Sequence, residues 1–383
     1  MSRKITIFSN FSEDRRFSMD FYAMHLERAL RAALVNAPSA EEVLVERFRP
    51  SLTRWGRIVP DAGNARMRIA RYLGYPHQVR GMGTVGINHI VDHGYAHLLR
   101  TLSPSKTVVT VHDLIPILGW RGEIPGFRYP HRPRMLEYSL GFLRRAGRVV
   151  TVSQSTKADL VNHMDIPSDR VAVVANGLNE VFGVLDVPKK ELRRALGLPE
   201  QGYVVLVSGP DGACKNHQTS LEVLKRLRDI IPEPVFMVRY GDFTGGDSKN
   251  DVWAKRVRRM GLEQSTLATG VISDVELVRL FNASDCLLFP SLYEGFGWPP
   301  LEAMACGVPV VSSNAASLPE VMGDAGLMAD PLDIDGLTAG VRRVLTDETL
   351  RSELVSKGFE RVRHFTWERA ARSMLDIYRE IGL

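Results

Sequence analysis

Two glutamates flank a short glycine-containing loop in PSLYEGFGWPPLEAMACGVPVV, residues 290–311. Glu294 opens the loop, Glu302 follows a pair of prolines, and between them lie Gly295, Phe296 and Gly297. Glycine lets a ligand approach the backbone because it has no side chain. Proline is tolerated at the start of a helix, where the first amides have no intrahelical partner and attract anions. The stretch therefore predicts a phosphate-binding loop with two carboxylates at its rim.

The two carboxylates point to a particular kind of phosphate ligand. A carboxylate repels phosphate, so each should bind neutral groups of the same ligand, and the hydroxyls of a ribose and of a sugar are suitable partners. Together these groups describe a sugar nucleotide. A simpler interpretation exists for Glu302. The pattern predicts a helix over about Pro300–Cys306, and a carboxylate in its first turn gains roughly 0.3 to 1 kcal/mol from the helix dipole alone.

The elements that must position this loop are strands of parallel sheets. Apolar runs alternate with amphipathic stretches of helical length along the chain, as in βαβ units. In the first half the runs are residues 4–9, 41–48, 87–94, 106–113, 148–153 and 170–177; in the second half they are 202–209, 234–241, 265–272, 285–291 and 308–313. A polar, turn-rich segment, 179–202, separates the two sets and is interpreted as a linker that leads into a helix. We therefore expect two α/β domains of similar size.

Ligands of open parallel sheets bind beyond the carboxyl ends of the strands. If the two domains face each other, this rule brings His112, Lys215 and the loop of Glu294 around one crevice. His112 has an alternative role, because a histidine at a strand end often only satisfies a buried carbonyl group. Both interpretations of His112 remain open on the residues alone.

The stretch 291–326 closely resembles the signature of the family-four retaining glycosyltransferases. The resemblance extends in family order over most of the chain, through residues 108–116, 149–160, 171–182, 215–224, 269–291 and 365–378. It implies an α/β fold of the GT-B type, with two facing Rossmann-like domains, parallel sheets and an interdomain cleft. Residues 1–180 would bind the acceptor, 181–365 would bind the donor nucleotide sugar, and 366–383 would form a helix that crosses back to the N-terminal domain.

The resemblance also implies roles for individual residues. Glu294 would contact donor-sugar hydroxyls beside the amides of the loop glycines, and Glu302 would hold the ribose. Lys215 would neutralise the diphosphate, and His112 would face the transferred sugar. The catalytic candidates are thus His112, Lys215 and Glu294, and the donor-binding candidates are Gly209, Lys215, Val271, Ile272, Glu294, Gly295, Phe296, Gly297 and Glu302. Val271 and Ile272 would flank the nucleobase.

Two departures from the family pattern affect these assignments. Many members carry an arginine directly after the glycine that ends the first strand of the C-terminal domain, whereas Gly209 is followed by Pro210. A glycine pair after the first N-terminal strand is replaced by NFSEDRRFSMDF, residues 10–21. Lys215 or another arginine would then carry the phosphate charge, and the loop on the acceptor side is left unassigned.

The predicted function is transfer of a hexosyl group, with mannose favoured, to a saccharide or a lipid-linked saccharide with retention of configuration. GDP-mannose is the favoured co-substrate, and we expect neither a cofactor nor a metal ion. Two other functions fit the same fold: a sugar-nucleotide epimerase, and a nucleotide-sugar-binding subunit without catalytic activity. GMGTVG, residues 81–86, resembles a dinucleotide fingerprint but precedes a strand, so it is a weak signal. Asp333–Asp335 resembles a metal motif, but helix capping explains it.

Composition limits the remaining classes. The chain has 383 residues, 44% hydrophobic and 24% charged, which fits two or three globular domains. The three cysteines form no disulfide or metal pattern, and no apolar run reaches the ~18 residues of a membrane span, so we expect a cytoplasmic protein. The net charge of +5 includes an arginine-rich and aromatic stretch, Arg121–Arg148. That stretch suits peripheral contact with an anionic membrane at its inner face, or is simply a solvated helix face, whereas no nucleic-acid module accompanies it.

Overall fold

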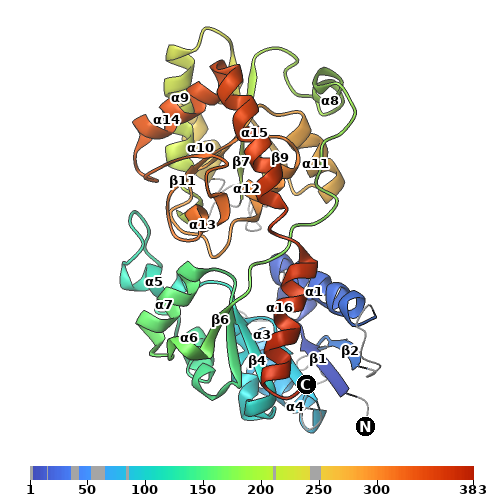
Figure 1. Cartoon of the computed structure of the whole chain (residues 1–383). Helices are drawn as coiled ribbons and strands as arrows, with labels where there is room; N and C mark the ends of the chain where they lie inside the picture. The colour runs from blue at the N-terminus through green and yellow to red at the C-terminus, as the bar shows by residue number, and fades with distance from the viewer. Residues whose placement is uncertain are drawn as a thin grey trace. The chain divides into compact units, whose positions relative to one another are not determined.

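The computed structural model of the chain describes residues 3–14, 16–35, 43–52, 65–82, 86–209, 213–241 and 252–383. The chain forms two compact units (Figure 1). The first contains Met1–Arg121, Tyr129–Gly177 and Phe365–Leu383, and the second contains Gly122–Arg128 and Leu178–His364. The C-terminal segment thus belongs to the first unit.

The first unit is built on a six-stranded parallel sheet with the order β2-β1-β3-β4-β5-β6. Its strands are β1 Arg3–Phe8, β2 Val43–Phe48, β3 Ile87–Ile90, β4 Thr107–Val111, β5 Arg148–Thr151 and β6 Val171–Val173. The two central strands, β3 and β4, are buried along their whole length. This is the continuous apolar pattern of a parallel sheet covered on both faces.

Helices surround this sheet. They are α1 Phe17–Val35, α3 Ala65–Ile69, α4 Tyr75–Gln78, α5 Ile115–Arg121, α6 Arg134–Leu140, α7 Gln154–Met164 and α16 Trp367–Glu380, with a π-helical segment, η2, at Ala70–Gly74 and a 3-10 segment, η4, at His93–Arg100. Shorter 3-10 turns are η1 Ser12–Asp14, η5 Pro104–Lys106, η6 Leu143–Arg145 and η7 Ser168–Arg170.

The C-terminal helix α16 lies along α1 (Figure 1). Its first residue, Trp367, packs edge-on against Tyr22 of α1, with ring centroids 5.7 Å apart. Near its end, the Tyr378 hydroxyl lies 2.7 Å from Nδ1 of the buried His89 in β3. An apolar stripe and one buried polar contact therefore join the last helix to the first sheet.

The second unit contains another six-stranded parallel sheet, with the order β12-β11-β10-β7-β8-β9. Its strands are β7 Tyr203–Ser208, β8 Val235–Tyr240, β9 Thr266–Gly270, β10 Cys286–Phe289, β11 Val310–Ser313 and β12 Leu327–Ala329. Every predicted run overlaps a strand of one of the two sheets. The short edge strand β12 was not predicted, because three partly exposed residues carry no clear apolar pattern.

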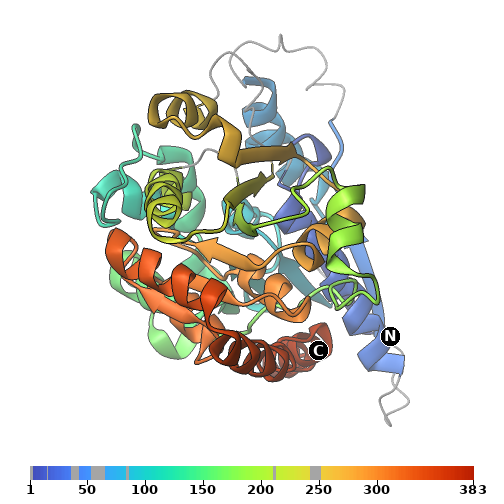
Figure 2. The same cartoon turned by 90° about the horizontal axis from the view of Figure 1, so that it is seen from above.

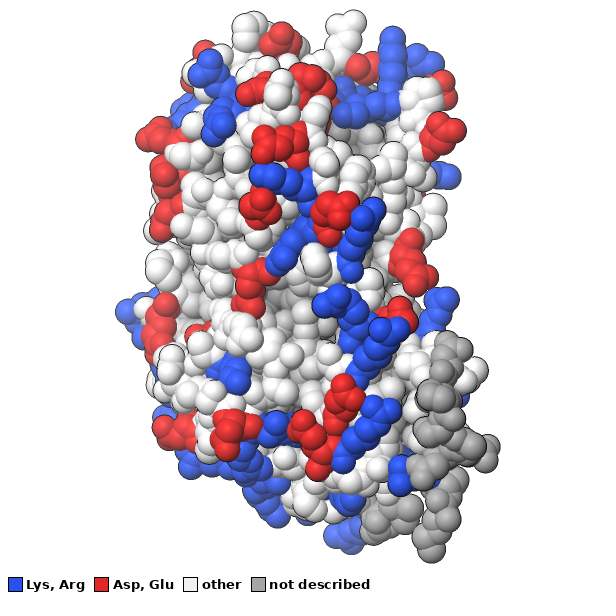
Figure 3. Space-filling view, in the orientation of Figure 1, with Lys and Arg blue, Asp and Glu red and all other residues white. Residues whose placement is uncertain are grey.

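Helices cover both faces of the second sheet (Figures 1 and 2). They are α8 Lys189–Ala195, α9 His217–Ile230, α10 Val252–Met260, α11 Asp274–Asn282, α12 Trp298–Ala305, α13 Leu318–Met322, α14 Ile334–Thr346 and α15 Glu348–Val362, with 3-10 turns η8 Ala213–Lys215 and η10 Glu263–Ser265. One face packs in a continuous core with α9, α10 and α14. Acidic and basic side chains are interspersed over the visible surface of this unit (Figure 3).

The α/β class predicted from the sequence is confirmed by these two parallel sheets. Within the described ranges, no helix is both long enough and apolar enough to cross a membrane.

Candidate functional site

The predicted donor residues gather at the carboxyl edge of the second sheet. The strands β7 and β8 end at two glycines with left-handed backbones, Gly209 with φ +100° and Gly241 with φ +117°. A Cβ atom added to Gly209 would lie 2.8 Å from Cε of Lys215. The backbone angle therefore favours glycine at position 209, and a side chain there would displace the lysine.

Lys215 and Glu294 form an ion pair at this edge. Lys215 Nζ lies 2.7 Å from Glu294 Oε1, and the two side chains are 21% and 15% exposed. The ammonium also lies 5.1 Å from the ring centroid of Phe289, at the end of β10. The structure thus brings together two of the three predicted catalytic residues, which are 79 positions apart in the sequence. The pair leaves the remaining ammonium protons available to an anion.

The loop that carries Glu294, residues 290–297, is held from both sides. Its Leu292 amide donates to the carbonyl of Cys214 at 2.7 Å. The Asn216 amide group donates to the carbonyls of Pro290 and Pro331, at 3.0 and 2.7 Å. The Ser317 hydroxyl lies 2.9 Å from the Glu294 carbonyl. Asn216 and Ser317 are positioning residues that were given no role from the sequence, although they stand in the matched stretches 215–224 and 291–326.

Asn216 has a second feature that sequence reasoning could have used. Its backbone is left-handed, with φ +54°, and asparagine tolerates this conformation better than most residues. The αL residue sits between η8 and α9 and turns the chain so that Lys215 faces the loop of Glu294. A lysine and an asparagine directly before a helix therefore weakly indicate a turn that orients the lysine toward a site.

The helix after the loop begins earlier than predicted. The pattern indicated Pro300–Cys306, whereas α12 spans Trp298–Ala305 and is preceded by Gly297 with φ +123°. The prolines fit inside the first turn because amides there have no intrahelical partner. The expected place of Glu302 in the first turn is therefore wrong, and a dipole interaction at the helix start explains this residue less well. Because two prolines lack an N–H, loop amides must supply most donors to an anion.

Glu302 is half-buried on α12 and has unusual electrostatics. Burial raises the pKa of its carboxyl group to about 8; the charge of Asp274 adds to this effect, and Lys215 opposes it. A carboxyl group that keeps its proton at neutral pH can both donate and accept a hydrogen bond. This property suits recognition of a pair of hydroxyls.

The predicted nucleobase contacts follow β9. Val271 is 72% exposed, although it is a large apolar residue, and Ile272 is half-buried. Directly after them, Ser273 and Glu276 form a capping box that starts α11. Single exposed apolar side chains are common on protein surfaces, so the contact of Val271 and Ile272 with a nucleobase stays a prediction.

A buried arginine supports the turn at Gly209, after which the family's arginine is missing. Arg239, near the end of β8, is fully buried, and its Nε and Nη2 atoms lie 3.2 and 3.3 Å from the Gly209 carbonyl. His217 Nε2 lies 3.2 Å from the same carbonyl. These contacts fix the glycine turn under Lys215. Pro210 itself lies outside the described residues.

His112 lies in the first unit, directly after β4. It is buried, and its Nε2–H donates to the carbonyl of Val91 at 2.8 Å. Burial lowers the pKa of His112 to about 4, so the ring is neutral at physiological pH. The simpler interpretation, a histidine that satisfies a buried carbonyl, is therefore realised. Its proposed contact with the transferred sugar stays a prediction.

A polar cluster that was not predicted lies at the carboxyl edge of the first sheet. The buried Asp92 accepts hydrogen bonds from Asn10 Nδ2 at 2.9 Å, from Arg16 Nη1 at 2.7 Å and from the amide of Gly94 at 2.8 Å. Burial raises the pKa of Asp92, but Arg16 and these donors outweigh it and hold the pKa well below its usual range. Asn10 Oδ1 is buried without a hydrogen-bond partner in the described chain.

The two motifs that were set aside can be compared with the structure. Asp333 caps α14 and accepts from the amide of Gly336 at 2.9 Å, as the capping interpretation predicted. The fingerprint-like stretch 81–86 includes residues 83–85, which lie outside the described chain. In the described part of the chain, no three His, Cys, Asp or Glu side chains are grouped so as to hold a metal ion.

Comparison with known proteins decides the family. Residues 188–361 match the glycosyl transferases group 1, and residues 14–181 match Glycosyltransferase Family 4. The O-antigen chain mannosyltransferase B of Escherichia coli is 30% identical over 282 residues, which cover 72% of this chain and 70% of that protein. This chain is a family-four glycosyltransferase.

The glycosyltransferase also resembles a longer protein. The serotype-specific mannosyltransferase WbdA of Escherichia coli is 32% identical over 285 residues. The match covers 71% of the glycosyltransferase but about a third, 33%, of WbdA.

A solved structure supports the fold. Anabaena HepE, in complex with UDP and glucose, aligns with a TM-score of 0.72 at 18% identity, over 99% of the glycosyltransferase and 100% of HepE. The resemblance predicted from the sequence is confirmed at the level of family and of the α/β GT-B fold. The facing arrangement of the two domains stays a prediction.

Proposed function

We propose that this glycosyltransferase moves a hexosyl group, mannose in preference, from a nucleoside diphosphate sugar to a saccharide or lipid-linked saccharide acceptor. The observation that carries the proposal is the Lys215–Glu294 ion pair, which lies against Gly209 at the carboxyl edge of the second sheet. A cation for the diphosphate and an acid for the sugar hydroxyls are thereby held in contact. The names of the two mannosyltransferase relatives favour mannose.

In the proposed reaction, the bond between the anomeric carbon and the diphosphate oxygen breaks, and negative charge develops on that oxygen. Lys215 and the loop amides stabilise the charge, which is the role of preorganised donors in group transfer. The acceptor oxygen bonds to the anomeric carbon from the same side, and the departing phosphate takes its proton. The configuration at the anomeric carbon is then retained without a covalent intermediate. Glu294 therefore accepts hydrogen bonds from sugar hydroxyls and does not act as a nucleophile.

The donor base is proposed to be guanine, as in GDP-mannose. Anabaena HepE was solved with UDP, which supports a nucleoside diphosphate as the ligand class of this fold but does not identify the base. The exposed Val271 and the half-buried Ile272 would pack against the base, and Glu302 would bind the ribose.

We place the acceptor side near a membrane, in a cytoplasmic setting. The described arginine-rich stretch is less uniform than its sequence suggests, because Arg144 pairs with Asp165 and Arg148 pairs with Glu380. A smaller face remains. Its apolar members are Leu73, Met135 and Tyr138, exposed by 62%, 44% and 43%, and its arginines are Arg68, Arg100 and Arg134, whereas Arg132 pairs with Glu137 at 2.8 Å.

Tertiary contacts bring together the two distant segments that carry this smaller face. The Tyr72 hydroxyl donates to the Met135 carbonyl at 3.1 Å, and the Tyr72 and Tyr138 rings lie 6.0 Å apart. Exposed apolar side chains among arginines fit an anionic bilayer. Vesicles of phosphatidylglycerol and phosphatidylethanolamine should sediment the protein. Arg134→Glu should reduce this binding severalfold, whereas Arg363→Glu on the second unit should not. Equal binding of both variants would remove the face from the proposal.

The reaction itself is tested by a panel of sugar nucleotides. Nucleoside diphosphate release should be fastest with GDP-mannose and should depend on an added mannosyl acceptor. Conversion of the donor to an epimer without acceptor would identify an epimerase instead. Saturable donor binding with no product under any acceptor condition would identify a binding subunit.

A further inference from the structure

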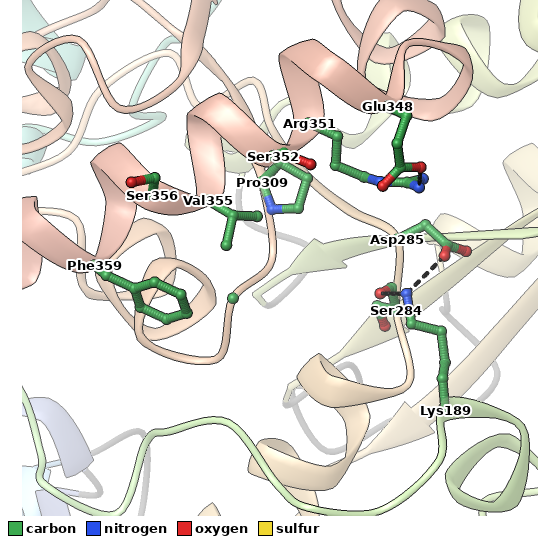
Figure 4. Close-up of a pocket in the computed structure, with 11 residues that line it drawn as sticks. Lys189, Ser284, Asp285, Pro309, Glu348, Arg351, Ser352, Val355, Ser356 and Phe359 are labelled. Atoms are coloured by element: carbon green, nitrogen blue, oxygen red, sulfur yellow. Dashed lines mark hydrogen bonds and ion pairs between the residues drawn. The ribbon is translucent and has the colours of Figure 1, made fainter.

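We propose that a second pocket in the second unit binds a small sugar phosphate. The pocket has a volume of about 500 Å³, within the range of ordinary ligand sites. It is lined by Ser284 and Asp285, which directly precede β10, and by Pro309, which precedes β11 (Figure 4). It therefore lies at the amino ends of these strands, whereas Lys215 and Glu294 lie at the carboxyl edge. This site is independent of the proposed donor site.

Helix α15 forms one wall of the pocket. Its lining residues recur at spacings of three and four, so they share one face of the helix: Glu348, Arg351, Ser352, Val355, Ser356 and Phe359 (Figure 4). The start of α8, with Lys189, and the segment 307–309 complete the lining. This face of α15 thus presents charged, hydroxyl and apolar side chains on successive turns of the helix.

The charged groups in this pocket and directly behind it do not cancel. Lys189 Nζ donates to Asp285 Oδ1 and to the Ser284 carbonyl, both at 2.9 Å. Asp285 also pairs with the buried Arg193, and Arg351 pairs with Glu348. Arg193 does not line the pocket, but it neutralises Asp285 from the buried side, so the charge of Lys189 is left uncompensated, whereas Arg351 and Glu348 balance each other. Lys189 keeps a third ammonium proton, and its side chain is 47% exposed, so it can donate to an incoming anion.

The rest of the lining indicates what the anion carries. The Ser352 and Ser356 hydroxyls are exposed, and neither forms a hydrogen bond with another described residue. Val355, Phe359 and Pro309 supply a short apolar surface. Hydroxyls beside a small apolar surface suit a sugar ring, which has a polar rim and an apolar face. A phosphate at Lys189 and Arg351 with its sugar along α15 would use all of these groups.

The pocket also contacts the linker between the two units. A Cβ atom added to Gly307 would lie 3.2 Å from the Phe359 ring and 3.4 Å from the Val184 side chain. Lys189 begins α8 directly after this linker. A ligand that contacts Lys189 and Phe359 would therefore lie at both ends of the linker residues 184–189. This position suggests that the pocket is an effector site.

Isothermal titration of the full chain with glucose 6-phosphate, glucose and inorganic phosphate tests the proposal. We expect saturable binding of glucose 6-phosphate that is tighter than binding of either fragment. Arg351→Ala should weaken it by about tenfold or more, the effect of one charge-assisted hydrogen bond. Ser356→Trp, at an exposed helix position, should block it by filling the pocket. Arg363→Ala is the matched control, because it removes an ion pair of the same i,i+3 spacing, to Glu360, outside the pocket.

Three outcomes would overturn the proposal. The first is the absence of saturable binding by glucose 6-phosphate at millimolar concentration. The second is binding that survives Arg351→Ala and Ser356→Trp but is lost in Lys215→Ala, which would place the ligand at the donor site. The third is equal affinity for inorganic phosphate, which would leave an anion site without a sugar subsite. Donor turnover by the Arg351→Ala variant should remain normal without effector, so failure of this proposal is distinguishable from failure of the proposed transfer reaction.

Discussion

Replacing Lys215 with methionine should lower kcat/KM for donor turnover by roughly 10- to 150-fold. Methionine keeps most of the aliphatic chain that packs against Gly209 but removes the ammonium group. A hydrogen bond to a charged group contributes about 1.5 to 3 kcal/mol, and about 1.4 kcal/mol corresponds to a tenfold change in rate. Because charge on the leaving oxygen develops in the transition state, the loss should fall mainly on kcat.

The ion pair with Glu294 gives a second, more specific expectation for the loss of activity. Its carboxylate lies 2.7 Å from the Lys215 ammonium, and both side chains are largely shielded, at 15% and 21% exposed. Two unit charges about 4 Å apart interact by about 4 kcal/mol at an effective dielectric constant near 20, and solvent lowers this value. Without the lysine, the unpaired carboxylate would repel the diphosphate. The double variant Lys215→Met/Glu294→Gln should therefore lose about 1 to 3 kcal/mol less than the sum of the single variants.

The assay is the initial rate of nucleotide release with the donor identified by the panel, with kcat and KM fitted separately. Lys225→Met, at an exposed position of α9, is the matched control and should keep normal rates. Thermal unfolding of each variant checks that the second unit is folded. A loss of less than threefold for Lys215→Met would refute the role of this ammonium, and strict additivity of the double variant would refute its coupling to Glu294.

Three further predictions follow from the geometry of the second unit. Gly209→Ala, with φ +100° and a Cβ 2.8 Å from Lys215, should lower the free energy of unfolding by about 1 to 2 kcal/mol and reduce kcat/KM more than tenfold. The control Gly261→Ala, with φ +67° and open space around its Cβ, should lower the free energy of unfolding without changing kcat/KM. Glu302 keeps a proton in the folded chain between its ordinary pKa of 4.5 and about 8, so its contribution to stability falls as pH rises through this window. Glu302→Gln should therefore gain unfolding free energy over the wild type between pH 5 and 8, by at most about 1.4 kcal/mol per pH unit, in denaturant titrations; a constant difference would contradict the raised pKa. Exhaustive chelation should leave turnover unchanged, and a loss that Mg²⁺ or Mn²⁺ restores would show that the reaction needs a metal.

Much of the fold could be predicted because its strands are short apolar runs bounded by turn residues. In β10, Cys286–Phe289 is buried throughout and ends at a proline, so both its state and its limit are local properties. The helix α12 was placed correctly in type but two residues late, because proline is compatible with more than one position of the first turn. The edge strand β12 has no local signal and exists because β11 offers it a ladder.

The candidate site was only partly predictable. Lys215, Glu294 and the loop glycines stand in motifs whose chemistry can be read from residue types. Ser317 and Asn216 support that loop through carbonyl groups, and any residue has a carbonyl, so no pairing is visible along the chain. Arg239 appears in the sequence as one charged residue within an apolar strand, and its contacts with the Gly209 carbonyl and the Trp253 ring are visible only in the tertiary structure.

By itself, the sequence determined the two sets of parallel strands, the glycine turn at 209, the acidic loop at 290–297 and, through the resemblance, the glycosyltransferase family. Tertiary structure decided which of these groups meet. Lys215 and Glu294 are in contact because β10 lies beside β7 in the strand order. Along the chain, the described elements between them are α9, β8, α10, η10, β9, α11 and β10. Residue patterns of period two or 3.6 report which side of an element is buried, whereas the order of parallel strands follows from packing between distant elements.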